Sequence, residues 1–141
     1  RLNLTINDNV LEACRQYNCQ KVVSFMSTCI FPDVTTFPLD ETMLHNGPPH
    51  DSCGGYAYAK RMIDVANHYY YRDHGMQCTG VIPTNVYGPH DNFHLRDSHV
   101  LAGLIHKCHI AQVSSKPFVI MGSGAPLRQF IHSEDLARLT V

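Results

Sequence analysis

Three residues of this chain have the types and the spacing to deliver a proton to a carbonyl oxygen. Tyr56 is followed one helical turn later by Lys60, and Ser27 lies upstream at the end of a strand-like run. A free phenol ionises only near about pH 10, but a lysine ammonium one turn away stabilises the phenolate. A serine hydroxyl can hydrogen-bond the same substrate oxygen. The three residues therefore predict general acid catalysis at a carbonyl group.

The segments that carry these residues have the patterns of a helix and a strand. The segment 21–27 is a short apolar run, typical of a strand covered on both faces. Gly75 suits the left-handed residue that closes a helix. Within the helix predicted after Cys53, four residues at helical spacing form a buried stripe: Ala59, Ile63, Ala66 and Tyr70. The spacing alone also fits a surface Tyr–Lys pair beside an ordinary strand-end serine, and both interpretations stay open on the pattern.

Helical and strand-like segments alternate along the whole chain. In order, we expect helices over 6–17, 56–74 and 98–113, strands over 22–27, 78–82 and 118–121, and a last helix with Ser133 as its N-cap. This alternation predicts an α/β fold of the Rossmann type, a doubly wound parallel sheet with helices on both faces. The only glycine-rich candidate for a dinucleotide turn, Gly122-Ser123-Gly124, is followed by a proline and lacks the third glycine. We therefore expect an internal piece of a longer protein that lacks the first strands and the C-terminal part.

Composition narrows the classes of partner. The net charge of −1 gives no reason to expect nucleic acid or an anionic membrane as a partner, and no apolar run reaches the length of a membrane span. The six cysteines contain no Cys-x-x-Cys pair and fit a reducing compartment, where most would be inert thiols. The ten histidines show no spacing typical of a zinc site, so we predict no metal.

Four further stretches carry a resemblance to a known family. They are 27–32, 45–50, 83–93 and 128–131, which read STCIFP, HNGPPH, PTNVYGPHDNF and RQFI. With Ser27, Tyr56 and Lys60, they make the chain similar to the extended short-chain dehydrogenase/reductases and, among these, to the GDP-L-fucose synthase family. The resemblance runs from Asn7 to Ala137. It implies that residues 1–141 are the middle, catalytic region of one NAD(P)-dependent epimerase/dehydratase-type domain.

The same resemblance implies an activity, a cellular compartment and an oligomeric state. Members of this family use NADPH to convert GDP-4-keto-6-deoxy-D-mannose into GDP-L-fucose, by 3,5-epimerisation followed by reduction of the 4-keto group. The resemblance therefore implies an oxidoreductase and isomerase of nucleotide-sugar metabolism that is a cytoplasmic homodimer. The partners expected are the GDP-sugar and a second copy of the chain. The 141-residue piece alone is expected to be inactive.

The resemblance also implies roles for single residues in catalysis. Tyr56 would protonate the C4 oxygen, Lys60 would contact the nicotinamide ribose, and Ser27 would hold the keto oxygen. Cys29 and His99 match the acid–base pair that inverts C3 and C5. A 4-keto group acidifies the protons on both neighbouring carbons, which a thiolate can remove and a histidine can return. Without the resemblance, Cys29 reads as a core thiol and His99 as a solvated loop residue.

Binding residues are implied in the same way. The segment Pro83, Thr84, Asn85 and Val86 resembles the stretch whose backbone lines the nicotinamide, and Tyr56, Lys60 and His99 join it as cofactor-binding residues. Without the resemblance, that segment is a strand-ending turn. Lys107 and Arg128 match positions that hold the nucleotide-sugar, where cations would face the diphosphate. Met121 stands where the family often has Trp, so any stacking contact of that indole would be lost.

Two other interpretations of the sequence remain open. The first is another nucleotide-sugar 4-epimerase or dehydratase of the same fold, which would need Ser27, Tyr56 and Lys60 but no carbon-acid pair. The second is a non-catalytic, truncated paralogue that keeps the fold as a dimerisation module. The missing glycine-rich turn favours the second, whereas the chain's catalytic residues are all intact, namely Ser27, Cys29, Tyr56, Lys60 and His99, which argues against it.

Overall fold

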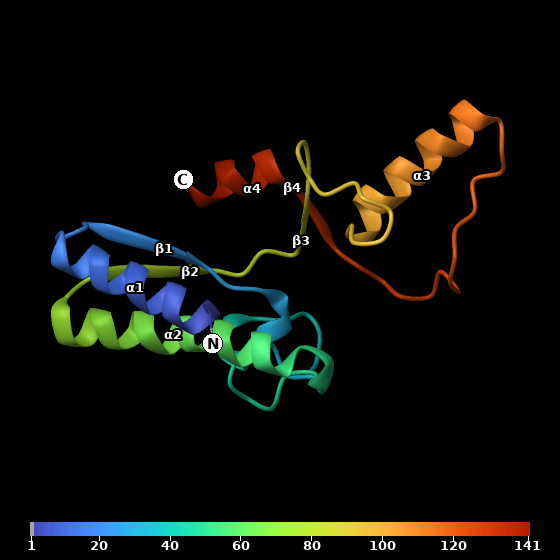
Figure 1. Cartoon of the computed structure of the whole chain (residues 1–141). Coiled ribbons are helices and arrows are strands. Elements are labelled where there is room, and N and C mark those ends of the chain that lie inside the picture. The colour runs from blue at the N-terminus through green and yellow to red at the C-terminus, as the bar shows by residue number, and fades with distance from the viewer. Residues whose placement is uncertain (1) are drawn as a thin grey trace. The chain divides into compact units, whose positions relative to one another are not determined.

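The computed structural model describes residues 2–141, which form two compact units. The first unit ends at Pro83, and the second spans Thr84–Val141. The first unit contains α1 (Leu2–Gln16), β1 (Lys21–Phe25), α2 (Gly54–His74) and β2 (Gln77–Val81) (Figure 1). The second contains β3 (Asn85–Tyr87), α3 (Val100–Ser114), β4 (Phe130–His132) and α4 (Ser133–Thr140). Three short 3-10 turns precede α2: η1 (Thr28–Ile30), η2 (Glu41–Met43) and η3 (Asp51–Cys53).

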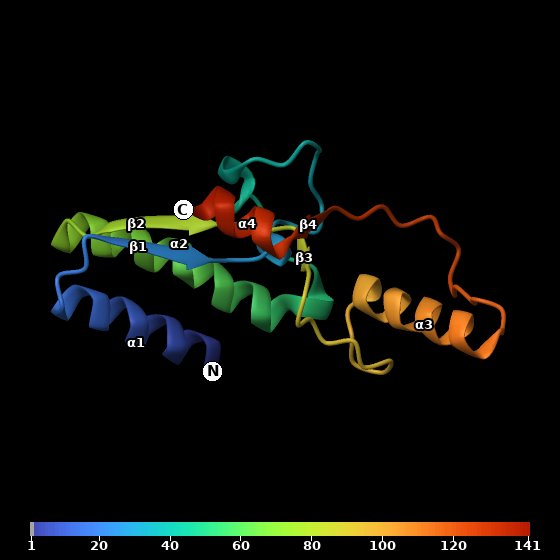
Figure 2. The same ribbon diagram turned by 90° about the horizontal axis from the view of Figure 1, so that it is seen from above.

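The first unit is built on a parallel pair of strands. β1 and β2 pair in register from Lys21 opposite Gln77 to Phe25 opposite Val81. α2 connects them, which is the usual way to join adjacent parallel strands. α1 and α2 run side by side along the pair, as the two views in Figures 1 and 2 agree. The predicted parallel α/β arrangement is therefore confirmed in this unit.

Both helices of the first unit pack on the same face of the strand pair. Val22 is buried there with Leu11 of α1, and Ala66 and Tyr70 of α2 pack against the same cluster. On the other face, Val23 and Phe25 are 37% and 42% exposed. The sequence predicted a strand covered on both faces, whereas no element of the first unit covers this second face. The alternation of buried and exposed residues follows from the two-residue period of a strand.

The helix that carries the predicted catalytic pair begins and ends close to the residues expected from the sequence. α2 begins two residues earlier than expected, at Gly54, and its C-cap Gly75 has a φ of 68°. That left-handed conformation costs glycine little, so the predicted role of Gly75 is confirmed. Ile63 of the predicted stripe is buried in a second cluster, with Met26 and Ile30, next to η1. Burial of this stripe fixes which face of α2 turns toward the end of β1.

The second unit contains a second parallel pair, which the sequence did not predict. β3 and β4 pair from Asn85 opposite Phe130 to Tyr87 opposite His132. Each strand has only three residues, too few to show an alternating pattern. Gly88 follows β3, and a side chain there would collide with the Ser133 hydroxyl at the start of α4. Glycine at this position therefore allows the close approach of the strand end and the helix.

Two predictions about the second unit are wrong. The segment 118–121 forms no strand, and its side chains are exposed; it is apolar and β-prone but has no partner strand in the described residues. Ser133 is the first residue of α4 instead of its cap. His132 is the N-cap, because its Nδ1 accepts a hydrogen bond from the Glu134 N–H. A histidine is an uncommon cap, so the serine next to it gave the stronger signal.

Candidate active site

The end of β1 and the first turns of α2 meet through Lys60. Its Nζ donates a hydrogen bond to the carbonyl oxygen of Phe25, the last residue of β1, at 2.9 Å. Tyr56 lies one turn earlier on α2, so its side chain starts from the same face of the helix. The Lys60 ammonium is therefore held between the strand end and the turn of α2 that carries Tyr56.

Tyr56 is available for contact with a ligand. Its side chain is 42% exposed, and its hydroxyl makes no hydrogen bond to any residue between 2 and 141. Lys60 has three N–H donors, of which the Phe25 carbonyl takes one. A phenol without a partner, one helical turn from a partly free ammonium, is a donor set that suits both a carbonyl oxygen and sugar hydroxyls.

Ser27 begins the turn that follows β1. It is extended, with a φ of −159°, and caps η1. Its Oγ accepts a hydrogen bond from the Cys29 N–H at 3.3 Å, which leaves the hydroxyl proton free to be donated. Cys29 itself lies inside η1. The cap thus fixes the Ser27 side chain relative to the turn that carries Cys29.

A buried arginine of α2 is hydrogen-bonded to η1. Arg61, the residue after Lys60, is only 7% exposed, and its Nε donates to the Ile30 carbonyl at 2.5 Å. Its Nη2 is buried without a hydrogen-bond partner among residues 2–141. Arg61 was not predicted from the sequence, although it follows Ala57 by four residues and so shares the helix face on which Ala57 is buried. Arg61 therefore connects α2 to η1 independently of Lys60.

A second cysteine lies next to Cys29. The thiol of Cys53, at the end of η3, is the neighbour of the Cys29 thiol, and it donates a hydrogen bond to the His50 carbonyl oxygen, 3.4 Å from its Sγ. Burial, the hydrogen bond to Cys29 and the charge of Cys29 when ionised all raise the pKa of Cys53. The raised pKa favours the protonated form of Cys53, whose S–H donates to the His50 carbonyl oxygen. No sequence spacing pointed to this pair, because the loop between the two residues folds back to form it.

The remaining predicted site residues, except Pro83, belong to the second unit. Pro83 closes the first unit, and Thr84 opens the second. Asn85 and Val86 lie in β3, where the Asn85 side-chain amide donates to the Gln129 carbonyl at 2.9 Å. That bond ties β3 to the segment just before β4.

Helix α3 and the segment after it carry the other predicted residues. His99 is the N-cap residue of α3, but its side chain makes no capping bond and is exposed. Lys107 is half-buried on the same helix. Met121 is 80% exposed, and Arg128 is exposed with its Nη1 donating to the Leu127 carbonyl. Within the described part of the second unit, none of these four side chains makes a hydrogen bond or an ion pair with another side chain.

Two classes of feature are absent from the described residues. Within residues 2–141, no three side chains of His, Cys, Asp or Glu converge as metal ligands. In the same range, no helix has the length and apolarity needed to cross a bilayer.

Comparison with known proteins identifies the family. The model of the NAD dependent epimerase/dehydratase family matches residues 1–141. The chain belongs to this family. The epimerase/dehydratase family relatives include the GDP-L-fucose synthase of Dictyostelium discoideum, 61% identical over 100% of this chain and 44% of the relative. The GDP-L-fucose synthase of Escherichia coli is 36% identical, over 99% of this chain and 44% of the length of the bacterial protein.

Solved structures of the same family confirm the fold. A GDP-L-fucose synthetase from Naegleria fowleri bound to NADP matches with a TM-score of 0.90 and 48% identity, over 97% of this chain and 45% of that one. The predicted resemblance to GDP-L-fucose synthases and the α/β Rossmann-type class are thereby confirmed. The chain spans less than half the length of these relatives.

Proposed function

We propose that this chain provides the catalytic region of an NADPH-dependent epimerase–reductase that converts GDP-4-keto-6-deoxy-D-mannose to GDP-L-fucose. The observation that carries the proposal is the Lys60–Phe25 hydrogen bond, which holds the ammonium one turn from an exposed, unpartnered Tyr56 phenol. The identity of 61% to a GDP-L-fucose synthase supports the substrate. Residues 1–141 are proposed to form the middle part of one epimerase/dehydratase-type domain.

In the reductive half of the reaction, three side chains act on the sugar C4 oxygen. Tyr56 donates its phenolic proton to that oxygen as negative charge develops on it. The nearby Lys60 ammonium stabilises the phenolate that remains. Ser27 donates its free hydroxyl proton to the same oxygen, since its lone pair already accepts from the Cys29 N–H. NADPH, when bound, supplies the hydride that reduces C4.

Residues of each unit are proposed to bind the cofactor. The free N–H groups of Lys60 suit the ribose hydroxyls, and Tyr56 is the neighbouring donor. The nicotinamide is proposed to face the backbone from Pro83 to Val86, and His99 is proposed as a further cofactor-binding residue. The Asn85 side chain is already engaged, because its amide donates a hydrogen bond to the Gln129 carbonyl. Only the backbone of this segment is therefore assigned to the cofactor.

In the epimerisation half, Cys29 and His99 are proposed as the acid–base pair. The Cys29 thiolate removes a proton next to the keto group, and the imidazole of His99 returns one on the opposite side of the ring.

Binding of the GDP-sugar is assigned to cations of the second unit. Lys107 and Arg128 would face the diphosphate, where charge-assisted hydrogen bonds are strongest. The exposed Met121 would contact the nucleotide-sugar without the stacking that an indole provides. The protein is further proposed to be a cytoplasmic homodimer that uses α1 and α2 as its interface.

The direct test uses the full-length protein with GDP-4-keto-6-deoxy-D-mannose and NADPH. We expect NADPH oxidation with formation of GDP-L-fucose, separated from its stereoisomers by chromatography. Reduction without inversion at C3 and C5 would leave a reductase and remove the roles of Cys29 and His99. No NADPH oxidation at all would reject the enzyme and favour the non-catalytic dimerisation module.

A further inference from the structure

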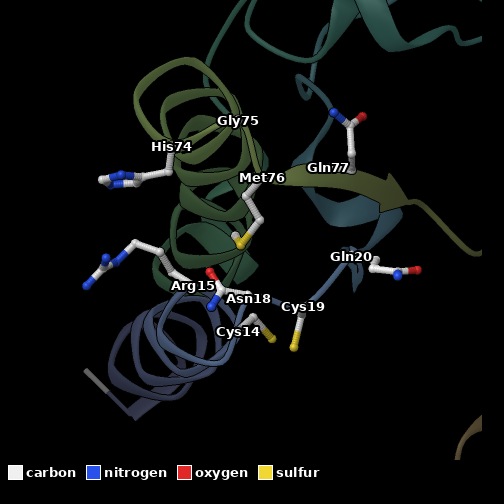
Figure 3. A pocket seen from close by; sticks show the side chains of 9 residues that line it. All are labelled: Cys14, Arg15, Asn18, Cys19, Gln20, His74, Gly75, Met76 and Gln77. Carbon is white, nitrogen blue, oxygen red and sulfur yellow. The ribbon is translucent and has the colours of Figure 1, made fainter.

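Helix α1 ends in a turn that brings two cysteines together. Asn18 has a φ of 51°, its N–H donates to the Arg15 carbonyl at 3.2 Å, and the Cys19 N–H donates to the Cys14 carbonyl at 2.9 Å. These two bonds define the Schellman ending, in which the side chains at the two positions occupied by Cys14 and Cys19 pack against each other. Figure 3 shows the two sulfur atoms side by side, and each thiol is close enough to influence the ionisation of the other.

The pair lies away from the candidate active site. Cys19 precedes β1 and Ser27 follows it, so the length of the strand, roughly 17 Å, separates them. Neither cysteine lies in any of the stretches that carry the family resemblance. A role for this pair therefore does not depend on the proposed reaction.

The surroundings make the two thiols unequal. Both line a hollow of about 400 Å³ at the junction of α1, α2 and β2, together with Arg15 and His74 (Figure 3). Cys19 is exposed, whereas Cys14 is partly buried and packs against the cluster around Leu11. A small molecule in solution therefore reaches the Cys19 sulfur first, and the Cys14 sulfur is held next to it.

We propose that Cys14 and Cys19 form a reversible dithiol–disulfide site that takes low-molecular-weight disulfides as its substrate class. The Cys19 thiolate attacks one sulfur of the small disulfide, whose S–S bond breaks and releases one thiolate. The mixed disulfide on Cys19 is then attacked by Cys14, which loses its proton to water. A second small thiolate leaves as the Cys14–Cys19 bond forms. Two protein thiols are thus oxidised, one small disulfide is reduced to two thiols, and no other oxidant is needed.

Burial and the neighbouring thiols decide which of the two cysteines reacts second. Burial, followed by the hydrogen bond to Cys19, raises the pKa of Cys14. Burial and the charge of Cys14 when ionised raise the pKa of Cys78 on β2. Both raised pKa values favour the protonated, less nucleophilic form of the inner thiols, and the exposed Cys19 is therefore the thiol that reacts first.

The test is incubation of the folded full-length protein with oxidised glutathione, followed by alkylation of the remaining thiols. Trypsin cleaves after Arg15, between the two cysteines, and again after Lys21. A Cys14–Cys19 bond therefore joins the peptide that ends at Arg15 to the peptide 16–21. We expect this cross-linked pair in the mass spectrum, and we expect its loss when reduced glutathione is added in excess.

Single variants separate the two steps. Cys14→Ser should lose the cross-link and accumulate glutathione on Cys19, because the second thiol is missing. Cys19→Ser should lose both the cross-link and the glutathione adduct at Cys14. Cys108→Ser is the matched control, since it removes another exposed thiol and should leave the cross-link unchanged. Circular dichroism checks that each variant is folded.

Two results would overturn the proposal. In the first, glutathione modifies Cys108 of the wild-type protein, while the peptide that ends at Arg15 and the peptide 16–21 stay unlinked. The other is a cross-link from Cys14 to the peptide that contains Cys78, which would show that the inner pair reacts instead.

Discussion

Tyr56 and Lys60 can act together because of their helical spacing and of one hydrogen bond that holds the lysine. Four residues make slightly more than one helical turn, which puts both side chains on one face of α2. The Phe25 carbonyl then holds the lysine ammonium at the strand end, at 2.9 Å. A tyrosine elsewhere on α2 has the same chemistry but lacks this neighbour.

Removing the Tyr56 hydroxyl tests the proton donor. We expect Tyr56→Phe to lower the rate of 4-keto reduction by about 10²–10⁴, the usual value of general acid catalysis. NADPH oxidation measured by absorbance reports the rate. Tyr58→Phe makes the same chemical change two residues along α2, at another exposed tyrosine, and should leave the rate unchanged. Equal rates in both variants would remove Tyr56 from the mechanism.

The epimerisation pair calls for a measurement separate from reduction. Cys29→Ser and His99→Gln should slow exchange of the substrate C3 and C5 protons with deuterated water more than they slow reduction of a substrate already inverted. The reason is that neither group acts on the C4 oxygen. Nuclear magnetic resonance follows the exchange, and Cys108→Ser and His109→Gln on α3 serve as matched controls. Unchanged exchange in both test variants would contradict the assignment.

At the scale of elements, η1 is the part of the site most dependent on a single buried residue. Arg61 donates to the Ile30 carbonyl at 2.5 Å and is almost fully buried. Arg61→Met keeps most of the packing but leaves that carbonyl without its donor. We expect a loss of about 1–3 kcal/mol in the free energy of unfolding, the cost of an unpaired buried group. Denaturant unfolding measures it.

Activity of the same variant distinguishes a general loss of stability from a local one. If Arg61 holds the turn, Arg61→Met should impair proton exchange at C3 and C5 even at temperatures where the variant is fully folded. Arg61→Lys retains the charge but cannot reproduce the planar guanidinium, so it should be intermediate. Wild-type exchange in a folded Arg61→Met variant would show that η1 keeps its shape without the arginine.

The contact between α1 and α2 predicts a dependence of stability on pH. Hydrogen bonds from Arg15 and then Gln16 lower the pKa of Glu12 to about 2, and the Tyr70 hydroxyl of α2 also donates to it at 3.4 Å. A depressed pKa in the folded state means that the contribution is complete above the unfolded value, near 4.3, and is lost as the pH falls toward 2.

Glu12→Gln should therefore be less stable than the wild type at pH 7 and indistinguishable from it near pH 2. Denaturant midpoints measured between these values give the profile. The effect should be small because Glu12 and Arg15 are exposed to solvent. A difference that stays constant from pH 7 to pH 2 would show that the change acts through packing or helix propensity instead of charge.

At the scale of the whole molecule, the first unit leaves apolar side chains uncovered on both of its helices. Leu2, Ile6 and Val10 recur every four residues on α1 and are exposed, as are Tyr58 and Met62 on α2. Side chains at this spacing lie on one side of each helix. Such faces suit an isologous interface between two copies of the chain.

Charged substitutions test the proposed homodimer. Val10→Glu and Met62→Glu should each convert a full-length dimer to monomers, because burying an unpaired carboxylate is unfavourable. Analytical ultracentrifugation at micromolar concentration measures the change. Val34→Glu, at an exposed apolar residue in the loop after η1, is the matched control and should stay dimeric. A wild-type monomer would exclude the interface at once.

The sequence by itself determined the local features of this protein. The spacing of Tyr56 and Lys60, the stripe of α2 and the glycine that closes it depend on neighbouring residues, and the structure has them as predicted. The parallel α/β class also followed from the sequence, because long periodic helices alternate with a short apolar strand.

Only the tertiary structure decided the contacts between distant residues. The pairing of Cys29 with Cys53 needs the folded loop between them, and the support of η1 by Arg61 needs the register of α2 against that turn. The same holds for the failure of 118–121 to form a strand, since a strand exists only through hydrogen bonds to a partner elsewhere in the chain. Local propensity fixes a segment's conformation where its own hydrogen bonds suffice, as in a helix, and leaves it undetermined where the partners are remote.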